Sequence, residues 1–200
     1  GVTVRPIVTL DGNHETNEVF LENVRVPVVN RLGEENKGWD YAKYLLGHER
    51  SGISRVGVSK MRLRRAKQMA QHIMEGGRPL GEDARFRERV AAIEVELKAL
   101  EITQMRVISE TTRAASGKPD PKTSILKMKG SELQQAATEL LLEVAGYDAM
   151  EYDGNFLRGL AESAREEAQW ALTAAPNHYF ARHVTIVGGS NEIQRNILAK

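Results

Sequence analysis

The sequence predicts a mostly helical fold, an antiparallel four-helix-type bundle preceded by a few short β-strands. Apolar residues recur at helical spacing between residues 53 and 144, while glycine and proline divide this region into long segments. β-Branched runs dominate only before residue 30. Apolar residues make up 41% of the 200-residue chain and charged residues 28%, which is enough to bury a core. We therefore expect residues 1–36 to be the tail of a β domain and residues 37–200 to be a helical bundle domain.

The N-terminal region has short runs rich in β-branched and aromatic residues, at positions 2–4, 7–9, 18–21 and 24–29. A turn signal at residues 11–13, Asp-Gly-Asn, separates the second run from the third. Three or four strands of this length have little core of their own and would leave sheet edges exposed. They are expected to end a β domain whose larger part precedes residue 1.

The three long helices are predicted from apolar residues that fall on one face of each. Gly76 and Gly77 should stop the first helix, and a second should begin after Asp83, which is a good N-cap residue, and end near Gly117. A third should stop at Gly146. The predicted faces are Ile53, Val56, Leu63, Ala66, Met69, Ala70 and Ile73, then Val90, Ile93, Leu97, Leu100 and Val107, then Leu133, Ala137, Leu140 and Val144.

The C-terminal region has a less regular pattern. Gly154, Gly159 and Pro176 interrupt it, although residues 161–175 still have helical spacing. The chain ends in an amphipathic helix over residues 190–200. Glycines and small polar residues precede this helix, and such residues can bring backbone N–H groups close to a ligand.

Composition excludes several classes of function. The 28 Lys and Arg against 27 Asp and Glu leave a net charge of +1, so no overall field draws the chain onto nucleic acid or an anionic membrane. The absence of Cys excludes disulfides, thiolate zinc sites and cysteine nucleophiles. Phosphate-loop and dinucleotide motifs, metal-ligand spacing and membrane-length apolar runs are also missing from the sequence. We expect a cytoplasmic protein that binds no metal and no nucleic acid and has no membrane span.

A basic run and two shorter features have alternative interpretations. The run from Lys60 to Lys67 is either a nucleic-acid patch or a solvated helix face, and the balanced charge favours the helix face. Glu49, between His48 and Arg50, is either a base in a cleft or half of a surface pair, and spacing alone favours the surface pair. Residues 188–189, Gly-Gly, are similarly either an anion cradle or a turn.

Read together, two motifs resemble the acyl-CoA dehydrogenase family. Residues 187–197 read Val-Gly-Gly-Ser-Asn-Glu-Ile-Gln-Arg-Asn-Ile, which is similar to the C-terminal signature Y-E-G-T-x-x-I-Q-R of that family. Residues 19–27 and 32–39 resemble its last middle-domain strands and the start of its C-terminal bundle. The resemblance covers essentially the whole chain and implies that a helical domain and most of a β domain precede it.

The resemblance implies a flavin-dependent α,β-dehydrogenation of an acyl-CoA thioester, in which a glutamate takes the α-proton. Family members place that glutamate either before the glycine of the signature or on the first long bundle helix. The first position is Gly188, which cannot act as a base, and the second matches Glu49. Glu49 is therefore the expected catalytic base, with Arg50, His48 and Gly188 expected to bind substrate.

The resemblance also implies FAD as cofactor, with contacts from Ser190, Asn191 and Glu192. Other flavin positions of the family are altered. Ile73 and Gly76 stand where the family has Arg and Phe, and Leu142 stands where it has a glutamine that donates hydrogen bonds. A non-catalytic subunit that serves as an assembly partner is therefore the alternative.

The partners that the resemblance implies are an acyl-CoA substrate, electron-transfer flavoprotein as electron acceptor, and further subunits in a homo- or hetero-oligomer. The segment over residues 147–179 is longer than the family pattern. It is expected either to shape the substrate pocket or an interface, or to be a surface elaboration without a catalytic role.

Overall fold

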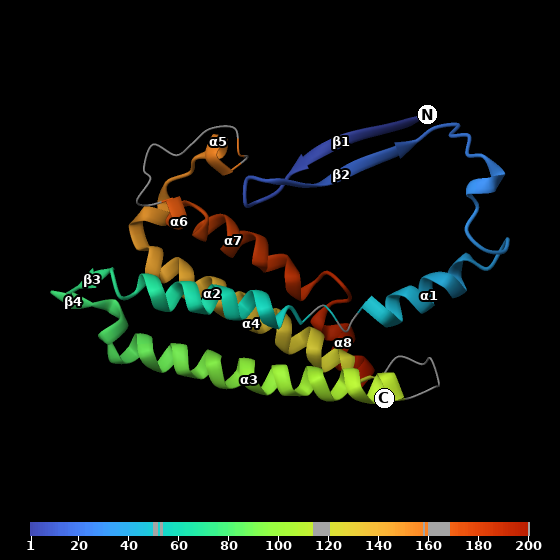
Figure 1. Ribbon diagram of the computed structural model, residues 1–200. Helices are drawn as coiled ribbons and strands as arrows, with labels where there is room; N and C mark the ends of the chain where they lie inside the picture. Colours follow the sequence, from blue (N-terminus) through green and yellow to red (C-terminus); the bar gives the residue numbers. More distant parts are fainter. Residues whose placement is uncertain (50–51, 53, 114–120, 158, 160–168, 200) are drawn as a thin grey trace.

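The computed structural model describes residues 1–49, 52, 54–113, 121–157, 159 and 169–199. It confirms the predicted fold class, because long helices pack side by side and a β-hairpin precedes them (Figure 1). Consecutive long helices run in opposite directions, as the short connections require (Figure 1). Three long helices form most of the bundle: α2 (Val56–Met69), α3 (Ala84–Arg113) and α4 (Thr123–Ala145). The fourth helical segment consists of two consecutive short helices, α6 (Gln169–Leu172) and α7 (Ala174–Phe180).

The N-terminal hairpin differs in detail from the prediction of three or four strands. It has one antiparallel pair, β1 (Val2–Val8) with β2 (His14–Leu21), in which Val2 pairs with Leu21. The predicted strand over residues 24–29 is wrong. The chain there forms a 3₁₀ turn at Val28–Asn30 after Pro27, which has no N–H to donate to a strand ladder. The predicted turn at residues 11–13 is confirmed, and Asn13 Nδ2 donates to buried Asp11 Oδ2 at 2.9 Å.

The first predicted long helix is divided into two. Helix α1 (Gly38–Glu49) ends before α2 begins, and Arg55, just before α2, has a left-handed backbone with φ of 45°. Helix α2 also stops before Ile73, because tertiary hydrogen bonds replace the next helical turn. The Gly81 N–H donates to Ala70 O and the Leu80 N–H donates to Ile73 O, both at 2.8 Å.

The connection from α2 to α3 is a short hairpin followed by a capped helix start. The strands β3 (Met74–Glu75) and β4 (Arg78–Pro79) flank the two glycines, and a 3₁₀ turn (Leu80–Glu82) follows. Asp83 is the cap that the sequence predicts, since its Oδ1 accepts from the Phe86 N–H at 2.9 Å. The apolar face predicted for α3 is entirely buried.

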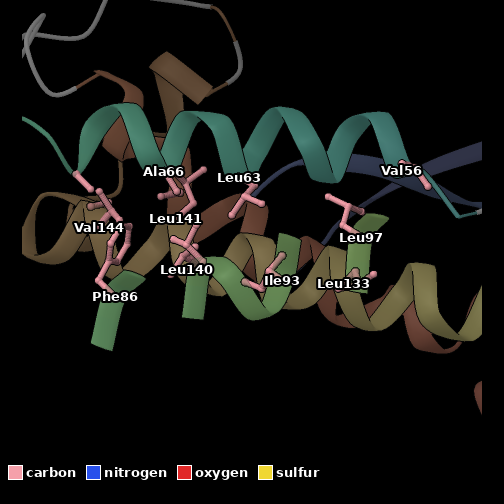
Figure 2. Packing of buried hydrophobic residues seen from close by; sticks show 14 of the residues in the cluster. Val56, Leu63, Ala66, Phe86, Ile93, Leu97, Leu133, Leu140, Leu141 and Val144 are labelled. Carbon is pink, nitrogen blue, oxygen red and sulfur yellow. The ribbon is translucent and has the colours of Figure 1, made fainter. Parts of the chain in front are cut away.

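The core lies between α2, α3 and α4. Figure 2 shows Leu63 and Ala66 of α2 directed at Ile93 of α3 and at Leu140 and Leu141 of α4. All of the apolar residues predicted for α4 are buried, and the helix ends at Gly146 with φ of 54°, as predicted. Such burial contributes about 25 cal/mol per Å² of apolar surface. The hydrophobic core between these three helices therefore supplies much of the stability of the bundle.

The C-terminal region consists of short elements around α4 (Figure 1). Most of the helix predicted over residues 161–175 lies outside the described residues. Pro176 does not break the chain there, because it falls in the first turn of α7, where its missing N–H costs nothing. The remaining elements are η3 (Gly146–Met150), α5 (Gly154–Leu157), η5 (Ala181–Thr185) and α8 (Asn191–Leu198). Among the described residues, no helix is both long and apolar enough to cross a membrane.

Candidate functional site

The predicted site residues come from two segments far apart in sequence. His48 and Glu49 close α1, and their side chains lie outside the described residues, as does the whole of Arg50. Gly188, Ser190, Asn191 and Glu192 form the loop before α8 and its first turn, and all four are described.

One turn of α4 contacts both segments. Gly130 lies against the backbone of Ser54, a few residues after Glu49, so closely that a Cβ on Gly130 would be 2.5 Å from Ser54 Cα. One turn earlier on the same helix, Lys127 Nζ donates to Asn191 Oδ1 at 2.7 Å. Helix α4 therefore fixes the start of α2 and the start of α8 on the same part of the bundle.

A buried polar seam on α4 makes the second of these contacts. Its five side chains are at most 3% exposed and recur every three or four residues, at Ser124, Lys127, Ser131, Gln134 and Thr138. Apolar periodicity does not indicate this seam, because its members are polar. The same helical spacing applied to the polar residues from Ser124 to Thr138 would have indicated a second inward-facing stripe.

The seam holds α8 through two side chains of the C-terminal signature. Asn191 is 5% exposed, and its amide donates to Ser131 Oγ at 3.1 Å while its oxygen accepts from Lys127. Gln194 is fully buried and accepts from Ser124 Oγ at 2.7 Å. Because its side chain is occupied inside the protein, Asn191 has only its backbone to offer a cofactor.

The start of α8 is a capped and electropositive helix terminus. Ser190 Oγ accepts from the Ile193 N–H at 3.4 Å, which makes Ser190 the N-cap. The pKa of Glu192 is lowered, first by a hydrogen bond from its own backbone N–H and then by one from the Ser190 hydroxyl. The carboxylate thus lies where a helix N-terminus favours negative charge.

The two glycines before the cap have backbones that favour glycine. Gly188 has φ of 68° and Gly189 has φ of 87°. The amide of Gln194 lies directly behind them and donates to the carbonyls of both glycines at 3.4 Å. A Cβ on Gly189 would be 2.4 Å from Gln194 Nε2, so the loop is held closely against the bundle.

The second region that the family pattern associates with flavin is the end of α4. Leu142 is half-buried there and packs against the hydrophobic core. A hollow of about 470 Å³ beside it is lined by apolar and acidic residues, with Arg89 as its single basic side chain, and Arg89 is paired with Glu143. Carboxylates and apolar side chains do not suit a diphosphate, so the side chains that line this hollow do not form an anion site.

The basic run of α2 lies mostly on its exposed face. Arg64, Arg65 and Lys67 are exposed, and Lys67 Nζ is 2.7 Å from Glu94 Oε1 of α3. Arg62 is half-buried, and its pKa is lowered by burial and then by the charge of Arg55. Among the described residues, no group of three or more His, Asp or Glu side chains could hold a metal ion.

Comparison with known proteins identifies the class to which this fold and loop belong. The family model for the C-terminal domain of acyl-CoA dehydrogenases matches residues 36–200, so the chain belongs to the acyl-CoA dehydrogenase family. The resemblance inferred from the two motifs is confirmed. Members of this family are FAD-dependent flavoproteins.

Individual relatives support the same assignment. The chain is 30% identical over 203 residues to acyl-CoA dehydrogenase FadE26 of Mycobacterium tuberculosis, an alignment that covers 99% of this chain and 47% of FadE26. It is 24% identical over 190 residues to the mitochondrial long-chain specific acyl-CoA dehydrogenase of Mus musculus, covering 93% of this chain and 39% of the mouse protein. The chain therefore spans less than half the length of these two relatives.

Solved structures resemble the whole chain. A chain of the ChsE4-ChsE5 complex from Mycobacterium tuberculosis is 29% identical and superposes with a TM-score of 0.76, over 100% of this chain and 49% of that one. The glutaryl-coenzyme A dehydrogenase in its glutaryl-CoA complex is 19% identical with a TM-score of 0.78, over 100% of this chain and 46% of that one. The second likeness shows the fold alone.

The loop before α8 has groups that fit part of a flavin. The loop and the first turn of α8 offer backbone N–H groups, which are donors that flavin oxygens and nitrogens accept from, while the Ser190 hydroxyl is directed to the Glu192 carboxylate. The positive φ of Gly188 and Gly189 lets the backbone approach a flat ring without a side chain between them. The residues at this loop therefore fit the cofactor of the family.

Proposed function

We propose that the protein to which this chain belongs catalyses the flavin-dependent α,β-dehydrogenation of an acyl-CoA thioester. The observation that carries the proposal is the shared anchorage on α4. Gly130 holds the chain just after Glu49, and Lys127 holds the loop before α8. A base and a cofactor loop that act on one substrate must be held in a fixed relative geometry, and the contacts that both segments make with α4 support the proposal.

Glu49 is the proposed base. The α-proton of a thioester is weakly acidic, so its removal needs a positioned carboxylate and hydrogen bonds that stabilise the charge developing on the thioester oxygen. The family position before the signature glycine is Gly188, which has no side chain, and this leaves the base to the first long helix. Bound FAD would supply an acceptor for the hydride that leaves the β-carbon.

The remaining site residues bind and orient. Gly188 provides room for the acyl chain, and its backbone N–H is a donor for the thioester oxygen. Arg50 and His48 are proposed to hold the CoA portion. Ser190 and Glu192, with the backbone of Asn191, are proposed to hold the flavin.

The proposed partners are electron-transfer flavoprotein as electron acceptor and further subunits in an oligomer. A hetero-oligomer is supported by the structural neighbour that was solved as a complex of two differently named chains, ChsE4 and ChsE5.

A non-catalytic subunit is the second candidate function, and Leu142 favours it. Its side chain packs against the core, so that position cannot donate to a cofactor. The two candidates differ in Glu49, because an assembly subunit needs no base there.

The decisive experiment uses the purified full-length protein with any co-expressed partner subunit. A panel of CoA thioesters, from short chains to long, branched and steroid-derived ones, is added without oxygen, and bleaching of the flavin is recorded. Turnover with an artificial electron acceptor is then measured for each substrate that bleaches. Bleaching with at least one thioester supports the proposal. A yellow protein that no thioester bleaches would reject it in favour of the assembly subunit.

A further inference from the structure

Lys127 is a buried cation without a contacting carboxylate among the described residues. It is 1% exposed, and the two acceptors of its ammonium are neutral oxygens. Lys127 Nζ donates to Thr185 O at 2.9 Å and to Asn191 Oδ1 at 2.7 Å. Burying a charge with neutral partners alone is costly, and an apolar residue of similar volume would often be neutral or stabilising. General stability therefore does not explain a lysine at this position.

The two acceptors lie at opposite ends of one loop. Thr185 closes η5 and Asn191 opens α8, so a single ammonium ties together both ends of residues 186–190. That loop contains the two glycines and the N-cap of the candidate flavin site. Ser131 supports the arrangement from the next turn of α4, since its hydroxyl donates to the same Asn191 oxygen at 3.2 Å.

The charge of Lys127 also lies behind the positive end of a helix dipole. The N-terminus of α8 carries partial positive charge, and the acidic group whose charge acts on Lys127 is Glu192, whose side chain is 76% exposed. Two positive elements side by side make the front of the loop favourable for negative charge. The arrangement thus suits a loop that faces ligand atoms with partial negative charge, such as carbonyl oxygens.

We propose that Lys127 is a positioning residue, which ties both ends of residues 186–190 and thereby holds this loop in the conformation that binds flavin and thioester. The proposal rests on the proposed function for the identity of the ligands. Because its ammonium is held by two protein oxygens, Lys127 is not proposed to touch either ligand. Its effect passes through Thr185 and Asn191.

The first test measures the loop without cofactor, by amide hydrogen exchange on the full-length apoprotein. Lys127→Met fills the same space without charge or donors, and Lys129→Met is the matched control. Lys129 lies on the exposed side of the same helix and pairs with Glu96 at 3.0 Å. Lys127→Met should accelerate exchange at least tenfold in peptides covering residues 183–193 and leave residues 84–112 unchanged. Exchange that is unchanged, or accelerated throughout the bundle, would overturn the proposal.

The second test measures the ligand. FAD binding to the same apoproteins should weaken about tenfold or more for Lys127→Met, which is the loss expected for charge-assisted hydrogen bonds, and should not change for Lys129→Met. In the loaded protein, kcat should fall more than KM changes, because the loop conformation matters most to the reacting geometry. A loosened loop with unchanged FAD affinity and kinetics would also overturn the proposal.

If Lys127→Met does not fold, a second pair of variants tests the same tie from the side of Asn191. Asn191→Asp keeps an oxygen at the position that Lys127 reaches, whereas Asn191→Ala removes one end of the tie. Because the backbone of Asn191 is proposed to contact flavin, this pair is compared by hydrogen exchange of the apoprotein alone. Asn191→Ala should loosen residues 183–193 more than Asn191→Asp, and equal behaviour of the two variants would contradict the tie. Absence of flavin bleaching in the unmodified protein would reject the proposed function alone, since hydrogen exchange of the apoprotein still decides the role of Lys127.

Discussion

Gly130 of α4 and Ser54, just before α2, touch through their backbones. A Cβ on Gly130 would lie 2.5 Å from Ser54 Cα and 2.7 Å from Ser54 O, which are separations that atoms of this kind do not adopt. Ser54 is fully buried, so it has no open space into which to move. Close approach of the two backbones therefore requires glycine at position 130.

Gly130→Ala should destabilise the bundle and displace the chain that follows Glu49. We expect a loss of about 1–3 kcal/mol in the free energy of unfolding, as for other overpacked cores, and a slower flavin reduction. Urea unfolding and stopped-flow bleaching measure the two effects. The matched control is Gly57→Ala in α2, where a Cβ meets no atom within 4 Å. There the substitution should be neutral or stabilising by up to about 1 kcal/mol, and equal losses at both positions would contradict the contact.

Asp83 should make the start of α3 sensitive to acid. Its pKa is lowered, first by the hydrogen bond from the Phe86 N–H, so the folded state favours the ionised carboxylate. The contribution of the cap to stability is therefore complete above the ordinary pKa of a free Asp, and it is lost as the pH falls through the lower folded value.

Substitutions at Asp83 separate the cap from its charge. Asp83→Ala should lower the urea midpoint at neutral pH, because the Phe86 N–H loses its acceptor. Asp83→Asn keeps an acceptor and should retain most of the stability. The difference between the unmodified protein and Asp83→Ala should shrink in acid, and a difference that stays constant with pH would show that the carboxylate has no part in it.

The sequence predicted those features of the fold that depend on local chemistry. Asp83 as a cap, Gly146 as a helix end and the apolar face of α3 are all confirmed, because each is decided within a few residues. The division of the first long helix was missed. The left-handed backbone at Arg55 and the hydrogen bond from Gly81 to Ala70 depend on packing against other elements, which periodicity does not register.

The sequence likewise predicted those parts of the candidate site that depend on local chemistry, but not those that depend on distant contacts. A motif was enough to place Ser190 at the start of α8, because its role as a cap is local. Lys127 was missed, since a lysine in a helix is ordinarily on the surface and its two acceptors come from a distant part of the chain. Asn191 was expected to contact cofactor, and the structure instead directs its side chain inward to Lys127.

Glu49→Gln should greatly slow the chemistry while leaving the flavin in place. The amide has nearly the shape of the carboxylate but cannot take a proton, so bleaching by a reactive acyl-CoA should slow by about 10²–10⁴-fold. FAD content and substrate affinity should stay close to those of the unmodified protein. Stopped-flow bleaching at several pH values makes the measurement, and undiminished bleaching would assign the base to another residue.

Gly189→Ala should loosen the flavin loop more than a comparable glycine substitution elsewhere. A backbone with φ of 87° costs about 1–2 kcal/mol for a residue with a side chain, and the new Cβ would also lie 2.4 Å from Gln194 Nε2. Gln194 cannot move away freely, because it is fully buried and bonded to Ser124 at 2.7 Å. Gly77→Ala is the matched control, since φ there is 82° but no atom lies within 4 Å of the new Cβ. Both variants should lose stability through backbone strain, and only Gly189→Ala should weaken FAD binding, as measured by titration of the two apoproteins. If the two variants bind FAD equally well, close packing of the loop against Gln194 is not what prepares it for the cofactor.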